Sequence, residues 1–274
     1  MPLPIHLALV SKTPAVAFGE VAIVSAAIQR QLIRDFNPIW DIDATIDAFE
    51  RPEDIPLGYW PIRIVDTFDD GGQHRVGLDD QPFALVAAGT SWSLAASHEA
   101  LEMLANPFGT WKVPGDSSMA NQGRVEFLVE VCDPCQSDEF AYTVNGVLVS
   151  DFYTREYFAP MRADGVRYSF RGAITQPREV LPGGYLSWRD PLTNDWFQEQ
   201  RFTGPSTFKR IGPLPEGTTN LRRAIDQRTP ETRRLAGLPP DRPAMQRAAA
   251  KQAASRAAAY AQAQRQDRRF DPRE

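Results

Sequence analysis

Apolar residues in the first third of the chain recur with two different spacings. Between residues 20 and 36 they recur every three or four positions, at Val21, Val24, Ile28 and Leu32, which is the spacing of an amphipathic helix. Shorter apolar runs and alternations are typical of strands, and they occupy residues 5–10, 42–49, 60–65 and 82–88. We therefore expect one helix packed on a sheet built from these strands.

The segment before the second predicted helix has the features of a sheet edge. Residues 67–81 are polar and contain glycine, which indicates a loop. Residues 82–88 follow as a strand, and Pro82 at its start suits an edge strand because proline cannot donate a ladder hydrogen bond. A mostly apolar helix comes next, with Ser91 or Ser93 able to cap its start and Pro107 ending it. We expect this helix on the same side of the sheet as the first.

The rest of the chain is β-rich and then changes composition. Residues 124–133 alternate as in a strand, Asn145-Gly146 predicts a hairpin turn, and short strands continue through residues 166–202. Beyond Gly217 proline, arginine and alanine dominate, and residues 248–264 favour a helix without an apolar stripe wide enough to bury. We predict an α+β fold with a core domain at 1–160, a β-rich extension at 161–216 and a linker with a helical or disordered tail at 217–274. Deleting that tail should leave the body folded.

Charge is distributed unevenly along the chain. The net charge of -5 combines +7 from residue 221 onward, where 13 Lys and Arg face 6 Asp and Glu, with -12 in residues 1–220. An acidic body argues against a nucleic-acid surface. The N-terminus lacks the pattern of a signal peptide, and no segment approaches the ~20 apolar residues of a membrane span, so we expect a soluble, cytoplasmic protein.

The second predicted helix carries a motif with the spacing of a metal site, His98-Glu99-Ala100-Leu101-Glu102. His98 and Glu102 share one helix face and can reach one ion, while Glu99 points about 100° away around the axis. The pentapeptide alone is more often a polar helix face. Here the helix is otherwise apolar and has no Lys or Arg, so two carboxylates are costly to bury unless they are paired or bind a metal. We therefore predict that His98 and Glu102 bind a metal and that Glu99 is the general base.

The third metal ligand has to come from another part of the chain. Glu130 and Asp133 stand at the end of the strand-like segment 124–133 and are the candidates. Glu130 is preferred because its longer side chain reaches further from a strand. We expect the ligating atoms of His98, Glu102 and Glu130 to lie within about 3 to 4 Å of one another, since metal bonds of about 2 Å require it.

The order of these elements resembles that of the zincin metalloproteases, in which the edge strand before the active helix pairs with the substrate backbone. The pattern S-H-E-x-x-E-x-x-x-x-P followed by E-x-x-D-x-C also resembles one found in bacterial proteins of unknown function and in the plant exordium family, over about residues 4–158. That pattern has Asp before the proline, where this chain has Asn106. The resemblance implies a zincin-like mixed, twisted sheet with an N-terminal helix and a metal-site helix.

The same resemblance bears on individual residues. A downstream glutamate is the third ligand in the gluzincin branch, which supports Glu130. Tyrosines donate a hydrogen bond to the oxyanion in several zincins, which makes Tyr153 a candidate catalytic residue, with a packing role in the core as its alternative. The departure is Glu102, because a true zincin has a second histidine there. His98 with two carboxylates would leave a zinc site neutral rather than about +1, so the metal would acidify its bound water less.

Metal identity follows from the same ligand set. Zinc is the expected cofactor, and the extra carboxylate shifts the preference towards manganese, iron or calcium. The Cys132-Asp133-Pro134-Cys135 sequence lacks the context of a redox pair and the second pair of a zinc knuckle. It therefore holds either two packing cysteines or residues beside the metal. His74, in the expected loop, is either solvated or a residue that controls access of metal or substrate.

The sequence leaves two functional hypotheses. The first is a metal-dependent hydrolase, with a peptide or protein as the candidate substrate. The second is a non-catalytic module that the metal stabilises and that binds a protein partner. An open metal position in a cleft beside residues 82–88 would favour the enzyme, and a closed, ligand-saturated site would favour the module.

Overall fold

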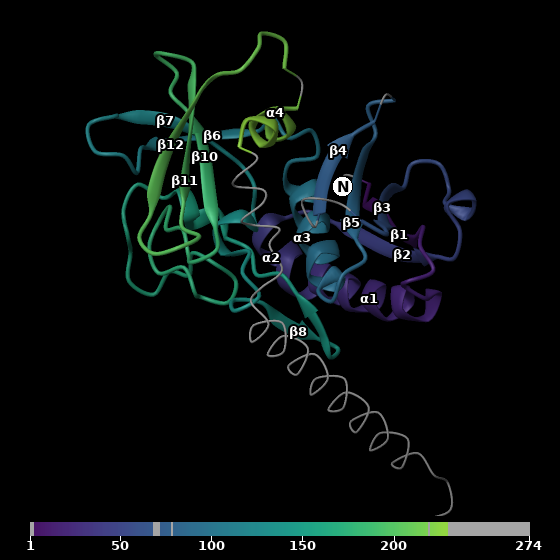
Figure 1. Ribbon diagram of the computed structural model, residues 1–274. Coiled ribbons are helices and arrows are strands. Elements are labelled where there is room, and N and C mark those ends of the chain that lie inside the picture. The colour runs from purple at the N-terminus through teal and green to yellow at the C-terminus, as the bar shows by residue number, and fades with distance from the viewer. Residues whose placement is uncertain (1–2, 68–71, 78, 219, 230–274) are drawn as a thin grey trace, which may run out of the picture.

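The computed structural model describes residues 3–67, 72–77, 79–218 and 220–229 of the chain (Figure 1). It confirms the α+β class, and the helix predicted at 248–264 lies outside the described residues. The helices are α1 (Phe18–Gln31), α2 (Asn37–Trp40), α3 (Trp92–Ala105) and α4 (Leu221–Arg228). The strands are β1 (Ile5–Ser11), β2 (Ala44–Phe49), β3 (Trp60–Val65), β4 (Gly72–Val76), β5 (Pro82–Ala87), β6 (Lys112–Asp116), β7 (Arg124–Leu128), β8 (Tyr142–Val144), β9 (Val147–Val149), β10 (Tyr185–Arg189), β11 (Asp195–Gln200) and β12 (Thr207–Pro213).

A five-stranded mixed sheet is formed by the N-terminal part of the chain, with the strand order β2-β1-β3-β5-β4. The first four of these strands are parallel, and β4 runs antiparallel to β5. The strands predicted near residues 5–10, 42–49, 60–65 and 82–88 are confirmed as members of this sheet. Central strands buried on both faces need continuous apolar runs, which is why β1 was readable from the sequence.

Two expectations about the edge of the mixed sheet are wrong. The outer strand is β4, which lies inside the segment expected to be a loop, and β5 lies between β3 and β4. Pro82 is tolerated in this inner position because it is the first residue of β5. Apolar alternation does not reveal β4, because its buried side chains, Gln73 and His74, are both polar.

Helices α1 and α3 cover the same face of the mixed sheet, as predicted (Figure 1). Leu9, Ile62, Ala84 and His74 are neighbours in register across β1, β3, β5 and β4, so their side chains point to one face. The first three are buried in one core with apolar residues of α1 and α3. His74 takes the fourth place in this row, so the polar site begins where the apolar row ends.

Helix α1 continues through a π-helical turn (Leu32–Phe36) into α2, which confirms a helix over residues 20–36. Its end is tied to α3 through polar contacts. The Ser97 hydroxyl donates to Oε1 of Gln31 at 2.8 Å and accepts the backbone N–H of Ser150 at 3.0 Å. The serine that precedes the motif histidine therefore fixes α3 against α1 and against the chain that follows β9.

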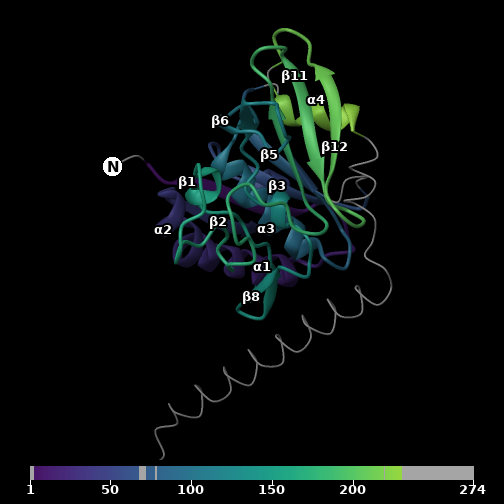
Figure 2. The same ribbon diagram turned by 90° about the vertical axis from the view of Figure 1, so that its left-hand side faces the viewer.

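A second, antiparallel sheet has the strand order β12-β11-β10-β7-β6 (Figure 2). The predicted hairpin is confirmed as β8 and β9, and its turn residues Asn145 and Gly146 have φ angles of 49° and 77°. Helix α4 lies between the two sheets (Figure 1). Its Ile225 is buried with Leu128 and Trp196, and its Asp226 accepts a hydrogen bond from Gln73 of β4.

The packing of α4 bears on the boundary expected at residue 217. α4 begins at Leu221 and buries apolar and charged side chains against both sheets, so the body continues beyond residue 217 and includes α4. None of the helices in the described ranges is both long and apolar enough to cross a lipid bilayer.

Candidate metal centre

The polar motif of α3 faces the interior of the protein. Glu99 and Glu102 are 4% and 1% exposed, and the His98 side chain is 13% exposed. A polar helix face that serves only to meet solvent would leave these side chains open to water. Their burial means that the neighbouring elements must supply their partners.

Strand β4 supplies a buried histidine. Nδ1 of His74 lies 3.5 Å from Oε2 of Glu99 and 3.8 Å from Oε2 of Glu102, and its Nε2 lies 3.9 Å from Oε2 of Glu130. Gly72, two residues earlier on the same face, makes room for this contact, because a Cβ atom there would lie 2.7 Å from Oε1 of Glu99. His74 is therefore neither in a loop nor solvated. This excludes one of the two alternatives left by the sequence, a solvated loop histidine.

The chain after β7 is held against α3 by backbone contacts. The Asn106 side chain donates to the carbonyl of Val129 at 3.0 Å, a bond that the aspartate of the similar pattern could not donate when ionised. The backbone N–H of Cys132 donates to Oε1 of Glu102 at 3.1 Å. Glu130 lies between Val129 and Cys132, and Asp133 follows Cys132, so these two bonds bring both acids into contact with the α3 motif.

Among the described residues, two groups of three side chains could each hold a metal ion. In each group, one ligand atom of every residue lies within 4.8 Å of the ligand atoms of the other two. The two groups are His74 with Glu102 and Glu130, and His98 with Glu102 and Cys132. Nε2 of His98 also lies 3.3 Å from Oε1 of Glu102 and 3.5 Å from Oδ1 of Asp133. The ligand set predicted from the sequence, His98 with Glu102 and Glu130, is thus divided between two groups that share Glu102.

Several buried polar atoms of this cluster have no hydrogen-bond partner within the described part of the chain. They are Nε2 of His74, both carboxylate oxygens of Glu130, Oδ1 of Asp133 and the hydroxyl of Tyr153. Each unpaired buried group costs about 1–3 kcal/mol, and more when it is charged. The atoms of His74, Glu130 and Asp133 in this set could serve as ligands for an electron-poor group such as a metal ion.

A cation from α4 enters the same cluster. The Arg222 guanidinium pairs with Oδ2 of Asp133, and its NH1 lies 3.6 Å from Oε2 of Glu130 and 3.8 Å from Oε2 of Glu102. On its other side Nε lies 3.0 Å from Oδ2 of Asp226. Nothing in the arginine-rich tail of the sequence distinguishes Arg222 from its neighbours, so sequence analysis could not have assigned it here.

The acids respond differently to this environment. Burial, reinforced by Glu102, raises the pKa of Glu130 well above its usual range, and burial raises the pKa of Asp133 to about 6 although Arg222 opposes it. Burial also disfavours ionised Glu102, but His98 and Arg222 more than compensate and lower its pKa. Burial works against protonation of His98, yet Glu102 and Asp133 raise its pKa well above the usual range. Without a further cation the cluster has too many carboxylates to ionise them all.

Two other predicted features lie at the border of the cluster. The Tyr153 ring is buried and stacks on Tyr157 with centroids 4.3 Å apart, and its hydroxyl has no hydrogen-bond partner among the described residues. Cys132 and Cys135 are buried and reduced, and a 3-10 turn over Asp133–Cys135 connects them. Cys132 contacts both His98 and Glu102 through its sulfur and backbone atoms, so the CDPC sequence lies beside the cluster and also packs in the core.

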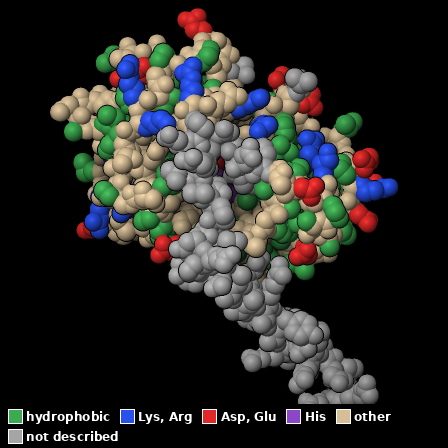
Figure 3. Space-filling view, in the orientation of Figure 1, with side chains coloured by type: hydrophobic (Ala, Val, Ile, Leu, Met, Phe, Trp, Pro, Cys, Tyr) green, Lys and Arg blue, Asp and Glu red, His purple; other side chains and the backbone are tan. Residues whose placement is uncertain are grey.

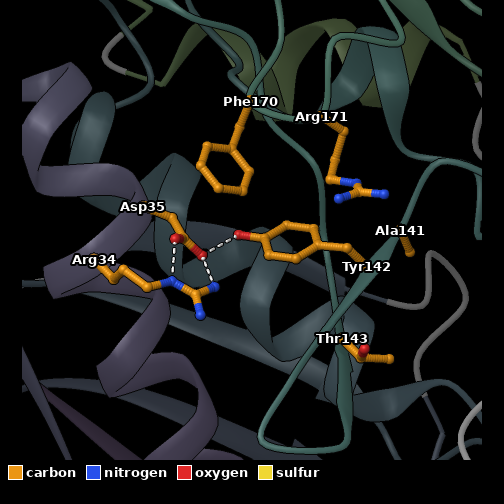
Figure 4. Close-up of a pocket in the computed structure, with 7 residues that line it drawn as sticks. All are labelled: Arg34, Asp35, Ala141, Tyr142, Thr143, Phe170 and Arg171. Atoms are coloured by element: carbon orange, nitrogen blue, oxygen red, sulfur yellow. Dashed lines mark hydrogen bonds and ion pairs between the residues drawn. The ribbon is translucent and has the colours of Figure 1, made fainter. Parts of the chain in front are cut away.

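The surface and the remaining cavities show less specialised chemistry. Basic and acidic side chains are interspersed on the face shown in Figure 3. A cavity of about 300 Å³ is lined by Arg34, Asp35, Tyr142 and Arg171, among others (Figure 4). The Asp35 carboxylate is already bonded to Arg34 at 2.5 and 2.7 Å and to the Tyr142 hydroxyl at 2.8 Å. Three of the polar side chains that line this cavity, Arg34, Asp35 and Tyr142, are therefore bonded to one another.

No family model, curated protein or solved structure was found to match this chain. The chemistry of the cluster has to be argued from its own geometry.

Proposed function

We propose that this protein is a metal-dependent hydrolase whose primary cation is held by His74, Glu102 and Glu130. The observation that carries the proposal is that one ligand atom of each of these three buried side chains lies within 4.8 Å of the others, while Nε2 of His74 and the carboxylate oxygens of Glu130 have no hydrogen-bond partner in the described part of the chain. A divalent cation would occupy the space that these atoms face and would offset the carboxylate charge. Ligands of this kind suit zinc and also manganese or iron.

His74 takes the place that the sequence hypothesis assigned to His98. Nε2 of His74 is the nitrogen that faces Glu130, whereas Nε2 of His98 faces Glu102 and Asp133. The two hypotheses share Glu102 and Glu130 and differ in the histidine. Replacement of each histidine by alanine distinguishes them, because loss of His74 should lower the affinity for the primary cation more than loss of His98.

Glu99 is suited to move protons beside this site. It belongs to neither group of three, and its Oε2 lies 3.5 Å from Nδ1 of His74. A bound divalent cation would polarise a substrate carbonyl and a water molecule. Glu99 would take a proton from that water and return it to the leaving group. The Tyr153 hydroxyl, which has no hydrogen-bond partner in the described ranges, would donate a hydrogen bond to the developing oxyanion.

An extended peptide is the substrate that best fits the neighbouring strand. β4 pairs with β5 on one side, and no strand within the described ranges pairs with its other side. A peptide that adds to this unpaired edge would gain backbone hydrogen bonds and would lie along the strand that carries His74, and it would have to share the edge with α4, whose Asp226 accepts a hydrogen bond from Gln73 of β4. The antiparallel edge strand followed by β5 and α3 supports the zincin-like interpretation, in which the edge strand pairs with substrate.

A non-catalytic, metal-stabilised module is the second candidate, and one observation favours it. The side chains of Glu102 and Glu130 are 1% and 5% exposed, and Arg222 of α4 covers them with its own side chain only 12% exposed. A site closed in this way would stabilise the fold through metal binding without admitting a substrate.

The experiment that decides between the two candidates combines metal analysis with hydrolysis. The full chain, purified without chelator, is tested on labelled casein and on a fluorogenic peptide library. We expect hydrolysis that chelator removes, and we expect Glu99→Gln to retain metal and lose activity at least about 100-fold, the lower range for a lost general base. Glu139→Gln, at an exposed position, is the matched control. Metal binding with no hydrolysis of any substrate would favour the structural module.

A further inference from the structure

The two oxygens of Glu102 face two different groups of potential ligands. Oε1 lies 3.3 Å from Nε2 of His98, whereas Oε2 lies 3.8 Å from Nδ1 of His74. Carboxylates that bridge two metal ions use their two oxygens in this way, and two-metal hydrolytic sites hold their ions about 3.5–4 Å apart. Glu102 is therefore placed to serve two cations, and the proposed primary site accounts for only one of its oxygens.

The side facing Oε1 has its own set of donors. Nε2 of His98, Oε1 of Glu102 and Sγ of Cys132 lie within 4.8 Å of one another. Oδ1 of Asp133 is 3.5 Å from the same His98 nitrogen, and it is buried with no hydrogen-bond partner in the described part of the chain. Ligands bonded tetrahedrally to one zinc ion lie about 3.3–3.8 Å apart, so the two distances from His98 already suit such a site.

The charge of the cluster supports two cations better than one. Four carboxylates, those of Glu102, Glu130, Asp133 and Asp226, lie around the guanidinium of Arg222, and a fifth, that of Glu99, faces His74. In the metal-bound state, with neutral histidines, ionised carboxylates and Cys132 as a thiolate, these groups would have a formal charge of −5. One divalent cation would leave −3 in a buried site, and two would leave only −1.

We propose that the cluster binds a second divalent cation through His98, Glu102, Cys132 and Asp133, with Glu102 bridging it to the primary cation. This inference rests on the proposed function, because the primary site is one half of the pair. The second site contains a thiolate and an imidazole and therefore prefers zinc, whereas the primary site is richer in oxygen and accepts manganese or iron more readily. The small exposed part of His98 is the side from which the second cation would enter.

Metal stoichiometry tests the second site separately from the first. The full chain is stripped of metal, reloaded with zinc or cobalt, dialysed and measured for metal per chain by plasma mass spectrometry. We expect two equivalents in the parent protein, one in Cys132→Ser, one in His74→Ala and none in Glu102→Ala. Cys135→Ser is the matched control, because this buried neighbouring cysteine belongs to neither group, and it should retain two.

Cobalt absorption keeps the test informative where a variant loses stability. The charge-transfer band of a thiolate bound to cobalt should appear in the parent protein and in His74→Ala and be absent from Cys132→Ser. One equivalent in the parent protein, with no thiolate band, would overturn the second site and leave the proposed function standing. No bound metal in any preparation would overturn both.

Discussion

The centre and the edge of the mixed sheet present the same face to the same pair of helices, yet they are held by different forces. Leu9 and Ile62, in β1 and β3, are fully buried among apolar side chains. His74, in β4 and in the same row, is as deeply buried but faces carboxylates from α3 and from the chain after β7. The centre needs only shape and apolar surface, whereas the edge needs charges to be matched.

This difference teaches where each part of the molecule draws its stability. Burial of apolar side chains stabilises the centre independently of pH and of metal. The edge is stable only when its carboxylates are protonated, paired with Arg222 or bound to cations, so its contribution depends on pH, on α4 and on metal. Four changes test this contrast.

Removal of α4 should have the largest effect. A chain ending at Gly217 loses the burial of Ile225, about 1.5–3 kcal/mol, and leaves Asp133 and Glu130 without Arg222, which typically costs a further 3–5 kcal/mol or so. We expect the free energy of unfolding to fall by roughly 5 kcal/mol or more. A chain ending at Thr229 should unfold like the full protein in urea. Equal stability of the two truncations would show that α4 does not hold the polar edge.

A pair of substitutions in one row of the sheet separates centre from edge. Ile62→Ala should lower the free energy of unfolding by about 2–5 kcal/mol with and without added zinc, because it leaves an apolar cavity. His74→Ala should change the metal-free protein much less and should abolish most of the extra stability that metal provides. Urea titrations with chelator and with saturating zinc measure both. If metal stabilises His74→Ala as much as the parent protein, His74 is not a ligand.

Asp151 tests whether a buried carboxylate outside the cluster behaves in the same way. Burial raises its pKa to about 6, while the backbone N–H groups of Arg171 and Phe152, and the Arg171 charge, act in the opposite direction. Since the folded pKa exceeds the unfolded value, Asp151 makes the parent protein lose stability as pH rises from about 4 to 6, by at most about 3 kcal/mol. Asp151→Asn should remove that loss. The free energy of unfolding of the variant, relative to that of the parent, should therefore increase as pH rises over this range. An unchanged difference between pH 4 and 7 would contradict the assignment.

The effect of Arg222→Met on metal affinity should be the smallest of the four in free energy, and the most specific. The guanidinium lies near the same oxygens of Glu102 and Glu130 that the primary cation would use, so its positive charge competes with the metal. We expect metal affinity to rise about tenfold, equivalent to about 1.4 kcal/mol, while the metal-free protein loses stability. Calorimetric titration measures the affinity, and Arg223→Met on the same helix is the control. Weaker metal binding in Arg222→Met would mean that the arginine organises the ligands.

The same contrast explains what could be predicted from the sequence. Apolar spacing predicted α1, α3 and the four parallel strands, because the hydrophobic effect imposes a period on the residues that it buries. The motif of α3 and the acids Glu130 and Asp133 were found because their spacing and type have a chemical reason. β4 was missed because a polar edge strand has no apolar period, and the position of His74 in the buried cluster was missed with it.

Long-range placement accounts for the rest. Arg222 lies 89 residues beyond Asp133, and no local pattern connects the two. The division of the predicted ligands into two groups also depends on which oxygen of Glu102 each histidine faces, a distinction of about one carboxylate width that only the tertiary structure determines.

The central claim is that the acidic cluster around Glu102 is a metal centre, and metal content tests it most directly. The full chain should be purified without chelator beside Glu102→Ala and the control Glu126→Ala, whose carboxylate pairs with Arg189 at the surface of β7. The account predicts stoichiometric divalent metal in the parent protein and in Glu126→Ala, and none in Glu102→Ala. Metal-free parent protein that fails to take up zinc or manganese on titration, or equal metal in Glu102→Ala, would contradict it.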